Sequence, residues 1–290
     1  MTNHTVPTAV ILMAYGSPER PEDIPAYFSD IRGGRQVRPE AVAELTERYR
    51  RIGGASPLNR ITETQREALA NATGLPVYVG MKHWSPWIPE AVEHALADGA
   101  ERLIAVVLAP HYSRLSIGGY RDRLEDALDG RAELVFIESW HDHEPYLELL
   151  ADRVRGSDAH VVFTAHSLPE RILTDGDPYR DQLLETARLV AERAGVTDWS
   201  FAFQSESATG EPWLGPDILV KLDALHAAGV ERVLVAPVGF VSDHLEILWD
   251  IDVEARDKAA ELGLDLDRIE SMNDDPAFLR ALAEVVRQRL

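Results

Sequence analysis

The order of hydrophobic and polar positions predicts an alternation of strands and helices along the chain. Short continuous apolar runs such as Thr8–Ala14 are typical of strands buried in a parallel sheet. Segments with helical spacing lie between them, and Pro39–Arg51 places a proline where the first turn of a helix accepts one. In the first half, strands are expected at Thr8–Ala14, Pro76–Gly80, Arg102–Leu108 and Glu133–Ile137, and helices at Ile24–Ile31, Pro39–Arg51, Asn59–Ala72, Ile88–Asp98 and Gly119–Leu128.

The same pattern restarts in the second half of the chain. Residues 161–169 repeat the run at 11–18, GVERVLVA (229–236) repeats GAERLIAV (99–106), and residues 274–283 repeat 143–151. Three repeats in one order indicate an internal duplication, with chance similarity between two α/β units as the alternative. Further strands are expected near Val161–Thr164, Ser200–Phe203, Arg232–Ala236 and Leu266–Ile269. The sequence therefore predicts two α/β domains, each with a four-stranded parallel sheet flanked by helices.

Ligands of open α/β sheets bind beyond the carboxyl ends of the strands, so the loops there are candidates for a site. These loops hold most of the His, Tyr, Trp and Ser residues; they are Tyr15–Pro18, Lys82–Trp87, Pro110–Gly118, His166–Pro169, Gln204–Gly215 and Gly239–His244. If the two domains face each other, the loops form one cleft. Tyr15 and His166 would then occupy equivalent places on its opposite walls.

Composition narrows the classes of function. The chain has 290 residues, of which 45% are hydrophobic, and its formal charge of −20 argues against nucleic acid and anionic membranes as partners. Because it has no cysteine, disulfides, thiolate-bound zinc and a cysteine-held iron–sulfur cluster are excluded. We expect no signal peptide, no stable membrane insertion and a cytoplasmic location. The sequence lacks four common motifs, namely G-x-G-x-x-G, Walker A, G-x-S-x-G and H-E-x-x-H. Their absence disfavours nucleotide-binding, hydrolase and zinc-protease functions.

A run of carboxylates follows the strand expected at Arg232–Ala236. Glu246, Asp250 and Glu254 recur at a spacing of four, which on a predicted helix places them along one side. Like charges at this spacing cost about 0.2–0.5 kcal/mol per pair. The run is therefore either a solvated acidic face or a ridge that receives a cation or protons.

Other candidate residues also allow two interpretations. His166 ends a strand. It is either a hydrogen-bonded turn residue or a functional residue, that is, a metal ligand or a proton acceptor. Together with Glu246 it would form an N/O site suited to Fe²⁺. Tyr15 is either a core residue or an oxygen ligand. Arg32, Arg35 and Arg48 are surface charges or a carboxylate-recognition group, and Trp84, Trp87 and Trp213 are core residues or a wall for a flat aromatic ligand.

Seven stretches together make the chain resemble the ferrochelatases, and more closely the coproporphyrin-type enzymes of Gram-positive and related bacteria. They are MAYGSP (13–18), IRGGR (31–35), RYRRIGGASPL (48–58), GMKHWSPW (80–87), FTAHSLPE (163–170), FQSESATGEPWLGPD (203–217) and GFVSDHLEILWDIDVE (239–254). The resemblance implies two similar Rossmann-like domains of the class II chelatase type. The first comprises residues 1–141 and a returning C-terminal helix at 274–290; the second comprises residues 142–273 and carries the metal-site His and Glu.

The resemblance also implies the activity and the site. A ferrochelatase, a lyase of haem biosynthesis, inserts Fe²⁺ into a porphyrin and releases two protons. The family's inner-site histidine matches His166, and its partner glutamate matches Glu246. These two residues form the metal-site pair. The family's acidic ridge matches Asp250 and Glu254. Which of His166 and Glu246 is ligand and which is base stays open. The family's tyrosine on the opposite face of the macrocycle matches Tyr15, and its propionate-end residues match Arg32, Arg48, Tyr49, Ser56 and Tyr120. Fe²⁺ is the substrate, and no organic cofactor is expected.

Two features favour coproporphyrin III over protoporphyrin IX as the substrate. The segment Arg114–Gly118 is expected to be a short polar loop, and no apolar extension follows Leu290. Both features favour a soluble monomer and a substrate with several carboxylates. The product would then be coproheme. Transient contact with other haem-pathway enzymes is left open. The alternatives are a protoporphyrin IX ferrochelatase, a sirohydrochlorin chelatase and a non-catalytic porphyrin or haem carrier.

Overall fold

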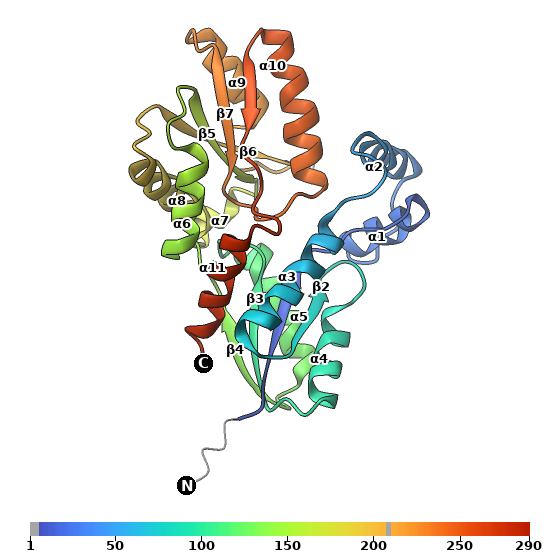
Figure 1. Cartoon of the computed structure of the whole chain (residues 1–290). Helices are drawn as coiled ribbons and strands as arrows, with labels where there is room; N and C mark the ends of the chain where they lie inside the picture. Colours follow the sequence, from blue (N-terminus) through green and yellow to red (C-terminus); the bar gives the residue numbers. More distant parts are fainter. Residues whose placement is uncertain (1–5, 207–209) are drawn as a thin grey trace. The chain divides into compact units, whose positions relative to one another are not determined.

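The computed structural model describes residues 6–206 and 210–290, and these contain two four-stranded parallel sheets (Figure 1). The first sheet has the strand order β2-β1-β3-β4. Its strands are β1 (Thr8–Ala14), β2 (Val77–Met81), β3 (Arg102–Val107) and β4 (Glu133–Ile137). All neighbours pair in parallel, and β1 is central and buried from Ala9 onward, which explains its continuous apolar run.

The second sheet has the order β6-β5-β7-β8, so each strand occupies the place of its counterpart in the first sheet. Its strands are β5 (His160–His166), β6 (Trp199–Gln204), β7 (Arg232–Pro237) and β8 (Asp265–Arg268). β5 is again central, with parallel neighbours on both sides. The predicted fold class is thereby confirmed.

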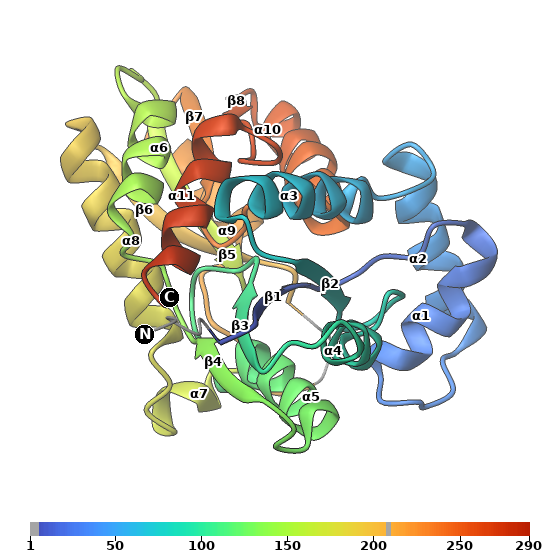
Figure 2. The same cartoon turned by 60° about the horizontal axis from the view of Figure 1, so that its bottom comes forward.

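Helices cover both faces of the first sheet (Figure 2). The helices of this unit are α1 (Ile24–Ile31), α2 (Pro39–Arg51), α3 (Leu58–Thr73), α4 (Ile88–Ala97), α5 (Gly119–Leu128) and α11 (Pro276–Arg287), with a short 3-10 turn, η1, at Pro21–Asp23. Of these, α1 and α2 pack against each other to one side of the sheet (Figure 1). The C-terminal helix α11 lies beside α3 on one face, and α4 and α5 cover the other. Gln65 of α3 donates to the carbonyl of Asn273 at 2.7 Å, which fixes the chain as it enters α11.

The second sheet is covered in the same manner by helices of its own. They are α6 (Glu144–Val154), α7 (Arg171–Thr174), α8 (Tyr179–Ala194), α9 (Ile218–Ala227), the π-helix η3 (Ile247–Ala255) and α10 (Arg256–Leu262). α6 packs against α8, and α9 packs against η3 and α10. Ile247 and Ile251 of η3 are fully buried against Val162 and Val235 of the sheet, so one side of η3 is fixed by core packing.

Contacts divide the chain into two compact units. The first contains the chain up to Ala109, Ser116–Trp140 and Asn273–Leu290, and the second contains Pro110–Leu115 and His141–Met272. The prediction placed residues 110–115 in the first domain, so the structure differs there. The reason lies in hydrogen bonds to the second unit: the backbone N–H of Tyr112 donates to Gln182 at 2.7 Å, and that of Arg114 donates to Asp177 at 2.7 Å.

Two helical segments differ from the expectation. The stretch at 242–254 was predicted as an ordinary helix, but its helical backbone begins at Leu245 and continues as the π-helix η3, which holds one more residue per hydrogen-bonded turn. The segment Arg114–Gly118, predicted as a loop, forms a single π-helical turn, η2. Within the described residues, no helix is both long and apolar enough to cross a membrane.

Candidate functional site

His166 is the last residue of β5, at the carboxyl edge of the second sheet. The strand behind it is fully buried, and the residue is aligned with Gln204 of β6. The hydroxyl of Tyr179 donates to its carbonyl at 2.9 Å, and the next residue, Ser167, donates through its N–H to the Gln204 carbonyl at 2.7 Å. These bonds fix the backbone, while the imidazole side chain keeps 32% of its surface exposed.

A glycine allows the loop after β7 to approach this strand. The N–H of Gly239 donates to the carbonyl of Thr164 at 3.2 Å, and a Cβ on Gly239 would lie 2.6 Å from the Cβ of Ala165. No larger residue fits without separating the two segments. The close approach brings the following loop, and with it Glu246, to the end of β5.

His166 and Glu246 form a hydrogen-bonded pair, with Nδ1 and Oε2 3.0 Å apart. Burial opposes the charged form of His166, but the charge and hydrogen bond of Glu246, with help from Asp250, raise the pKa of the imidazole above its usual 6.5. Burial likewise opposes the charge of Glu246, yet His166 outweighs it and lowers the pKa of the carboxyl to about 2. The pair is thus an imidazolium–carboxylate pair in mildly acidic solution.

Ser205 joins Glu246 to a second carboxylate. Its hydroxyl lies 3.1 Å from Oε2 of Glu246 and also hydrogen-bonds Asp250, so its single proton serves one of them at a time. Asp250 is 6% exposed. Ser205 follows β6 with a φ of +65°, in the left-handed region that serine rarely adopts. In the sequence, Ser205 is marked only by the matching stretch at 203–217, because nothing in its neighbours indicates this backbone conformation.

The remaining acidic and imidazole groups lie around this network. The Nδ1–H of His244 donates to the Ser242 carbonyl at 2.9 Å, and Nε2 of His244 lies 4.0 Å from Oε2 of Glu246. Glu254 is half-buried on the last turn of η3. Among the described residues, no group of three His, Asp or Glu side chains is arranged to hold a metal ion by itself.

In the first unit, Tyr15 comes directly after β1 and is 38% exposed. Its ring packs on that of His83 with centroids 4.5 Å apart. Nδ1 of His83 hydrogen-bonds Asp30 at 2.7 Å, yet burial, assisted by the cationic Lys82 and Arg123, lowers the pKa of His83 to about 4. A neutral imidazole therefore supports Tyr15. In the sequence, His83 is marked only by the matching stretch at 80–87, and nothing marks Asp30 as its partner.

Lys82, the neighbour of His83, is a half-buried lysine. Its Nζ donates to the Ser116 carbonyl at 3.1 Å and lies 4.7 Å from the ring centroid of Tyr120. Burial, with repulsion from Arg123, lowers the pKa of this lysine to about 8. Tyr120 itself is 5% exposed, so its ring mainly supports Lys82.

The other predicted porphyrin-binding residues differ in exposure. Arg32 is exposed and lies 5.3 Å from the ring centroid of Phe28, and Arg48 pairs with Glu44 at 2.9 Å. Ser56 is half-buried, and Tyr49 is buried with its hydroxyl 2.9 Å from that of Ser17. The structure thus gives Tyr49 a supporting place beneath the loop after β1.

Some expectations stay predictions. They include the common cleft of Tyr15 and His166 and the roles assigned to the individual site residues. Part of the matching stretch at 203–217, namely Ser207–Thr209, lies outside the described residues. Trp84, Trp87 and Trp213 are half-buried, so each retains an exposed surface.

Comparison with known proteins identifies the family. The family model described as Ferrochelatase matches residues 7–290. A ferrochelatase of Herpetosiphon aurantiacus is 46% identical, covering 96% of this chain and 98% of the relative. A coproporphyrin III ferrochelatase of Geobacillus thermodenitrificans is 41% identical over 97% and 95% of the two chains, and that of Bacillus subtilis is 38% identical over 97% of both.

Solved structures agree at the level of the fold. SirB from Bacillus subtilis, solved with Fe³⁺, aligns with a TM-score of 0.64 at 12% identity, covering 98% of this chain and 95% of SirB. CbiX, described as the terminal enzyme of sirohaem biosynthesis in denitrifying bacteria, aligns with a TM-score of 0.57 at 15% identity, covering 97% and 99%. The family match spans nearly the whole chain and includes every candidate residue described above. The chain therefore belongs to the ferrochelatase family.

Proposed function

We propose that this chain is a ferrochelatase that inserts Fe²⁺ into coproporphyrin III, giving coproheme and two protons. The observation that carries the proposal is the His166–Glu246 pair, joined through Ser205 to Asp250, at the carboxyl edge of the second sheet. A nitrogen donor next to carboxylates suits Fe²⁺ and also accepts protons. Relatives named coproporphyrin III ferrochelatases, at 38–41% identity, support the choice of porphyrin.

The raised pKa of His166 gives the site a means of binding iron weakly. As an imidazolium, His166 has a proton on each ring nitrogen and offers no lone pair to a metal. Fe²⁺ must therefore displace a proton that Glu246 stabilises, and this competition lowers the affinity of the site for the metal. Weak binding suits a metal ion that has to leave for the macrocycle. Once neutral, His166 can also accept a pyrrole proton.

The two pyrrole protons need a path away from the macrocycle. We assign the first steps to His166 and Glu246 and the transfer to Asp250 to the Ser205 hydroxyl, which hydrogen-bonds both carboxylates. Glu254, on the last turn of the same helix, would pass charge towards solvent. Release of each proton leaves the site ready for the next ferrous ion.

The choice of porphyrin rests on its carboxylates. Coproporphyrin III carries four propionates and protoporphyrin IX carries two, so the first substrate gains more from arginine partners. Arg32 is exposed and Arg48 is partly exposed, so both can meet a propionate. Tyr15 is exposed enough to contact the macrocycle, whereas the buried Tyr49 and Tyr120, with Ser56 near the start of α3, would support that end of the site. We further propose that the enzyme works as a cytoplasmic monomer.

Anaerobic insertion assays test the proposal. Purified protein is mixed with Fe²⁺ and either coproporphyrin III or protoporphyrin IX, and loss of the free-porphyrin absorption bands is followed. We expect rapid loss with coproporphyrin III and a much slower loss with protoporphyrin IX. Faster insertion into protoporphyrin IX would overturn the choice of substrate. Tight binding of both porphyrins with no insertion would overturn the enzymatic function and favour a carrier.

A further inference from the structure

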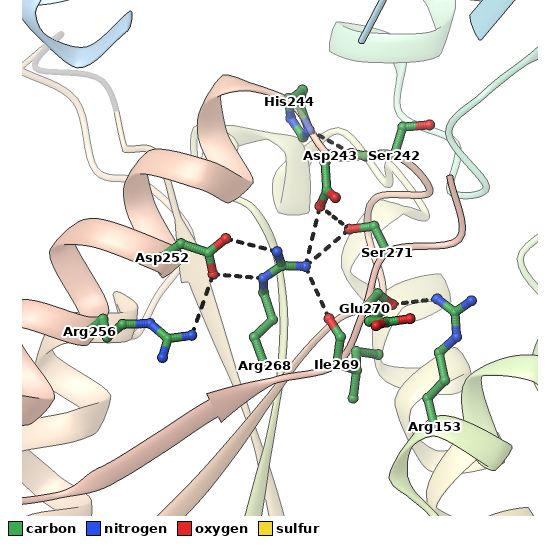
Figure 3. Close-up of polar contacts among 10 residues, drawn as sticks. All are labelled: Arg153, Ser242, Asp243, His244, Asp252, Arg256, Arg268, Ile269, Glu270 and Ser271. Atoms are coloured by element: carbon green, nitrogen blue, oxygen red, sulfur yellow. Dashed lines mark hydrogen bonds and ion pairs between the residues drawn. The ribbon is translucent and has the colours of Figure 1, made fainter. Parts of the chain in front are cut away.

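The segment that carries Glu246, Asp250 and Glu254 also holds Asp243 and Asp252, and these two aspartates have a different partner. Glu246 and Asp250 bond to Ser205, whereas Asp243 and Asp252 both bond to Arg268 (Figure 3). Asp243 and Asp252 flank Glu246 and Asp250 along a stretch of like charges that repel one another. Arg268 pairs only with Asp243 and Asp252, which leaves Glu246 and Asp250 available for the reaction.

The Arg268 guanidinium uses all of its nitrogen atoms in this contact. Its Nε and Nη2 donate to the two carboxylate oxygens of Asp252, each at 2.8 Å, and its Nη1 lies 3.3 Å from Oδ1 of Asp243. Nη1 also donates to the Ile269 carbonyl at 3.0 Å and to the Ser271 hydroxyl at 3.2 Å. Ser271 in turn donates to Asp243 at 2.7 Å. Figure 3 shows the guanidinium between the two aspartates.

The position of Arg268 in the fold makes it a rigid anchor. It is the last residue of β8 and pairs with Val235 of β7 in the sheet. Its side chain is 11% exposed, so its ion pairs are far less screened by water than surface pairs. The bidentate contact with Asp252 fixes orientation as well as distance. The cation thus joins the sheet to two points of the helical segment, one before Glu246 and one after Asp250.

We infer that Arg268 is a positioning residue for the iron site, holding the start of η3 so that Glu246 and Asp250 stay directed towards His166 and Ser205. This inference rests on the proposed function. A π-helical turn is a rare conformation that the surrounding structure must hold in place. Without Arg268, repulsion among the carboxylates of this segment would turn it and spread the positions of Glu246 and Asp250.

The test compares Arg268→Gln with Lys258→Gln. Lys258 lies on α10, directly after η3, and pairs with Asp223 at 2.7 Å, so its variant also removes one cation from the same helical segment. For Arg268→Gln we expect the KM for Fe²⁺ to rise about tenfold to a hundredfold. The dissociation constant of coproporphyrin III, measured by fluorescence quenching, should change less than about twofold, because the Arg268 guanidinium is already paired with Asp243 and Asp252 and does not bind a propionate. Lys258→Gln should leave both constants unchanged.

A second readout does not depend on turnover. Calorimetric titration with Zn²⁺ alone, without porphyrin, should show a weaker affinity for Arg268→Gln than for the wild type and Lys258→Gln. Arg268→Lys should recover part of the affinity, since an ammonium group meets one aspartate but cannot bridge both with a fixed geometry. Asp252→Asn supplies a milder variant should Arg268→Gln fail to fold, and it should raise the KM for Fe²⁺ by a smaller factor.

Two results would overturn the inference. One is a lowered melting temperature of Arg268→Gln with an unchanged KM for Fe²⁺ and unchanged Zn²⁺ affinity, which would assign Arg268 a structural role only. The other is an equal effect of Lys258→Gln, which would reflect net charge. A wild-type enzyme that inserts no iron would instead contradict the proposed function, and the Zn²⁺ affinities would still decide the role of Arg268.

Discussion

The two units each contain a histidine paired with a carboxylate at the carboxyl edge of their sheets, and the two pairs differ in charge. His166 lies 3.0 Å from Glu246, and His83 lies 2.7 Å from Asp30. The distances are similar, although the His166 side chain is 32% exposed and that of His83 only 9%. Yet the pKa of His166 is raised above 6.5, whereas that of His83 is lowered to about 4.

The next neighbours explain the difference. Asp250 adds a second negative charge near His166, so the imidazolium is favoured despite burial. Lys82 and Arg123 add positive charge near His83, so Asp30 cannot offset its burial. A carboxylate partner alone therefore does not decide whether a histidine is charged. The chemistry of the pair in the second unit suits proton exchange, whereas the neutral imidazole in the first unit supports Tyr15 by ring packing.

The largest expected effect comes from removing the imidazole of His166. We predict that His166→Ala lowers the turnover number for coproporphyrin III by about 10³, within the range found for a lost acid–base group. Porphyrin binding measured by fluorescence should persist. His160→Ala is the matched control, because His160 lies at the other end of β5 and pairs with Asp198 at 2.7 Å. Equal losses of turnover in both variants would show that the effect is structural.

The second prediction concerns stability and His83. An unfolded histidine binds its proton near pH 6.5, but folded His83 does so only near pH 4. The stabilisation from neutral His83 is therefore complete above pH 6.5 and is lost as the pH falls from 6.5 to 4. The loss is at most about 3 kcal/mol. Urea unfolding at several pH values should show a steeper decline for the wild type than for His83→Gln, and parallel curves would contradict the neutral assignment.

The third prediction concerns the protonation of His166. Burial is the largest influence on this imidazole, so Glu246→Gln should lower its pKa from above 6.5 to below it. A change of one pKa unit corresponds to about 1.4 kcal/mol. NMR titration of the imidazole carbons, assigned with a His166→Asn variant, measures the shift. A pKa that stays above 6.5 would mean that Asp250 suffices to hold the charge.

The smallest expected effect comes from Ser205. Ser205→Ala removes one hydroxyl that hydrogen-bonds Glu246 and Asp250, and water can replace part of the contact. We predict a loss of turnover of about fivefold, corresponding to about 1 kcal/mol for one hydrogen bond. Steady-state insertion assays would detect it. Ser167→Ala, at a hydroxyl that donates to the Leu214 carbonyl, is a control expected to affect stability more than turnover.

Much of the fold follows from local pattern. The run at Thr8–Ala14 is the observed β1, and the run before His166 is β5, because a strand buried on both faces leaves little alternative to continuous apolar residues. The spacing of Glu246 and Asp250 correctly placed them on one helical segment. It did not reveal the π-helix, since residues four apart lie on nearly the same side in both helix types.

The hydrogen bonds around His166 and His83 could not be predicted from local sequence pattern in this way. Ser205 reaches Glu246 and Asp250 across 41 and 45 residues of sequence, and Asp30 reaches His83 across 53. Serine and aspartate are common in loops, so their presence alone carries no signal. These residues are found only once the fold places the loop of Ser205 and the helix of Asp30 beside their partners.

The backbone of Ser205 has a consequence for engineering. With a φ of +65°, this serine sits in a conformation that favours glycine and costs about 1 kcal/mol or more for other residues. A selection for heat resistance alone would favour Ser205→Gly, which relaxes the backbone and deletes the hydroxyl. A selection for rapid iron insertion would restore the serine. Directed evolution under the two pressures should therefore move this position in opposite directions.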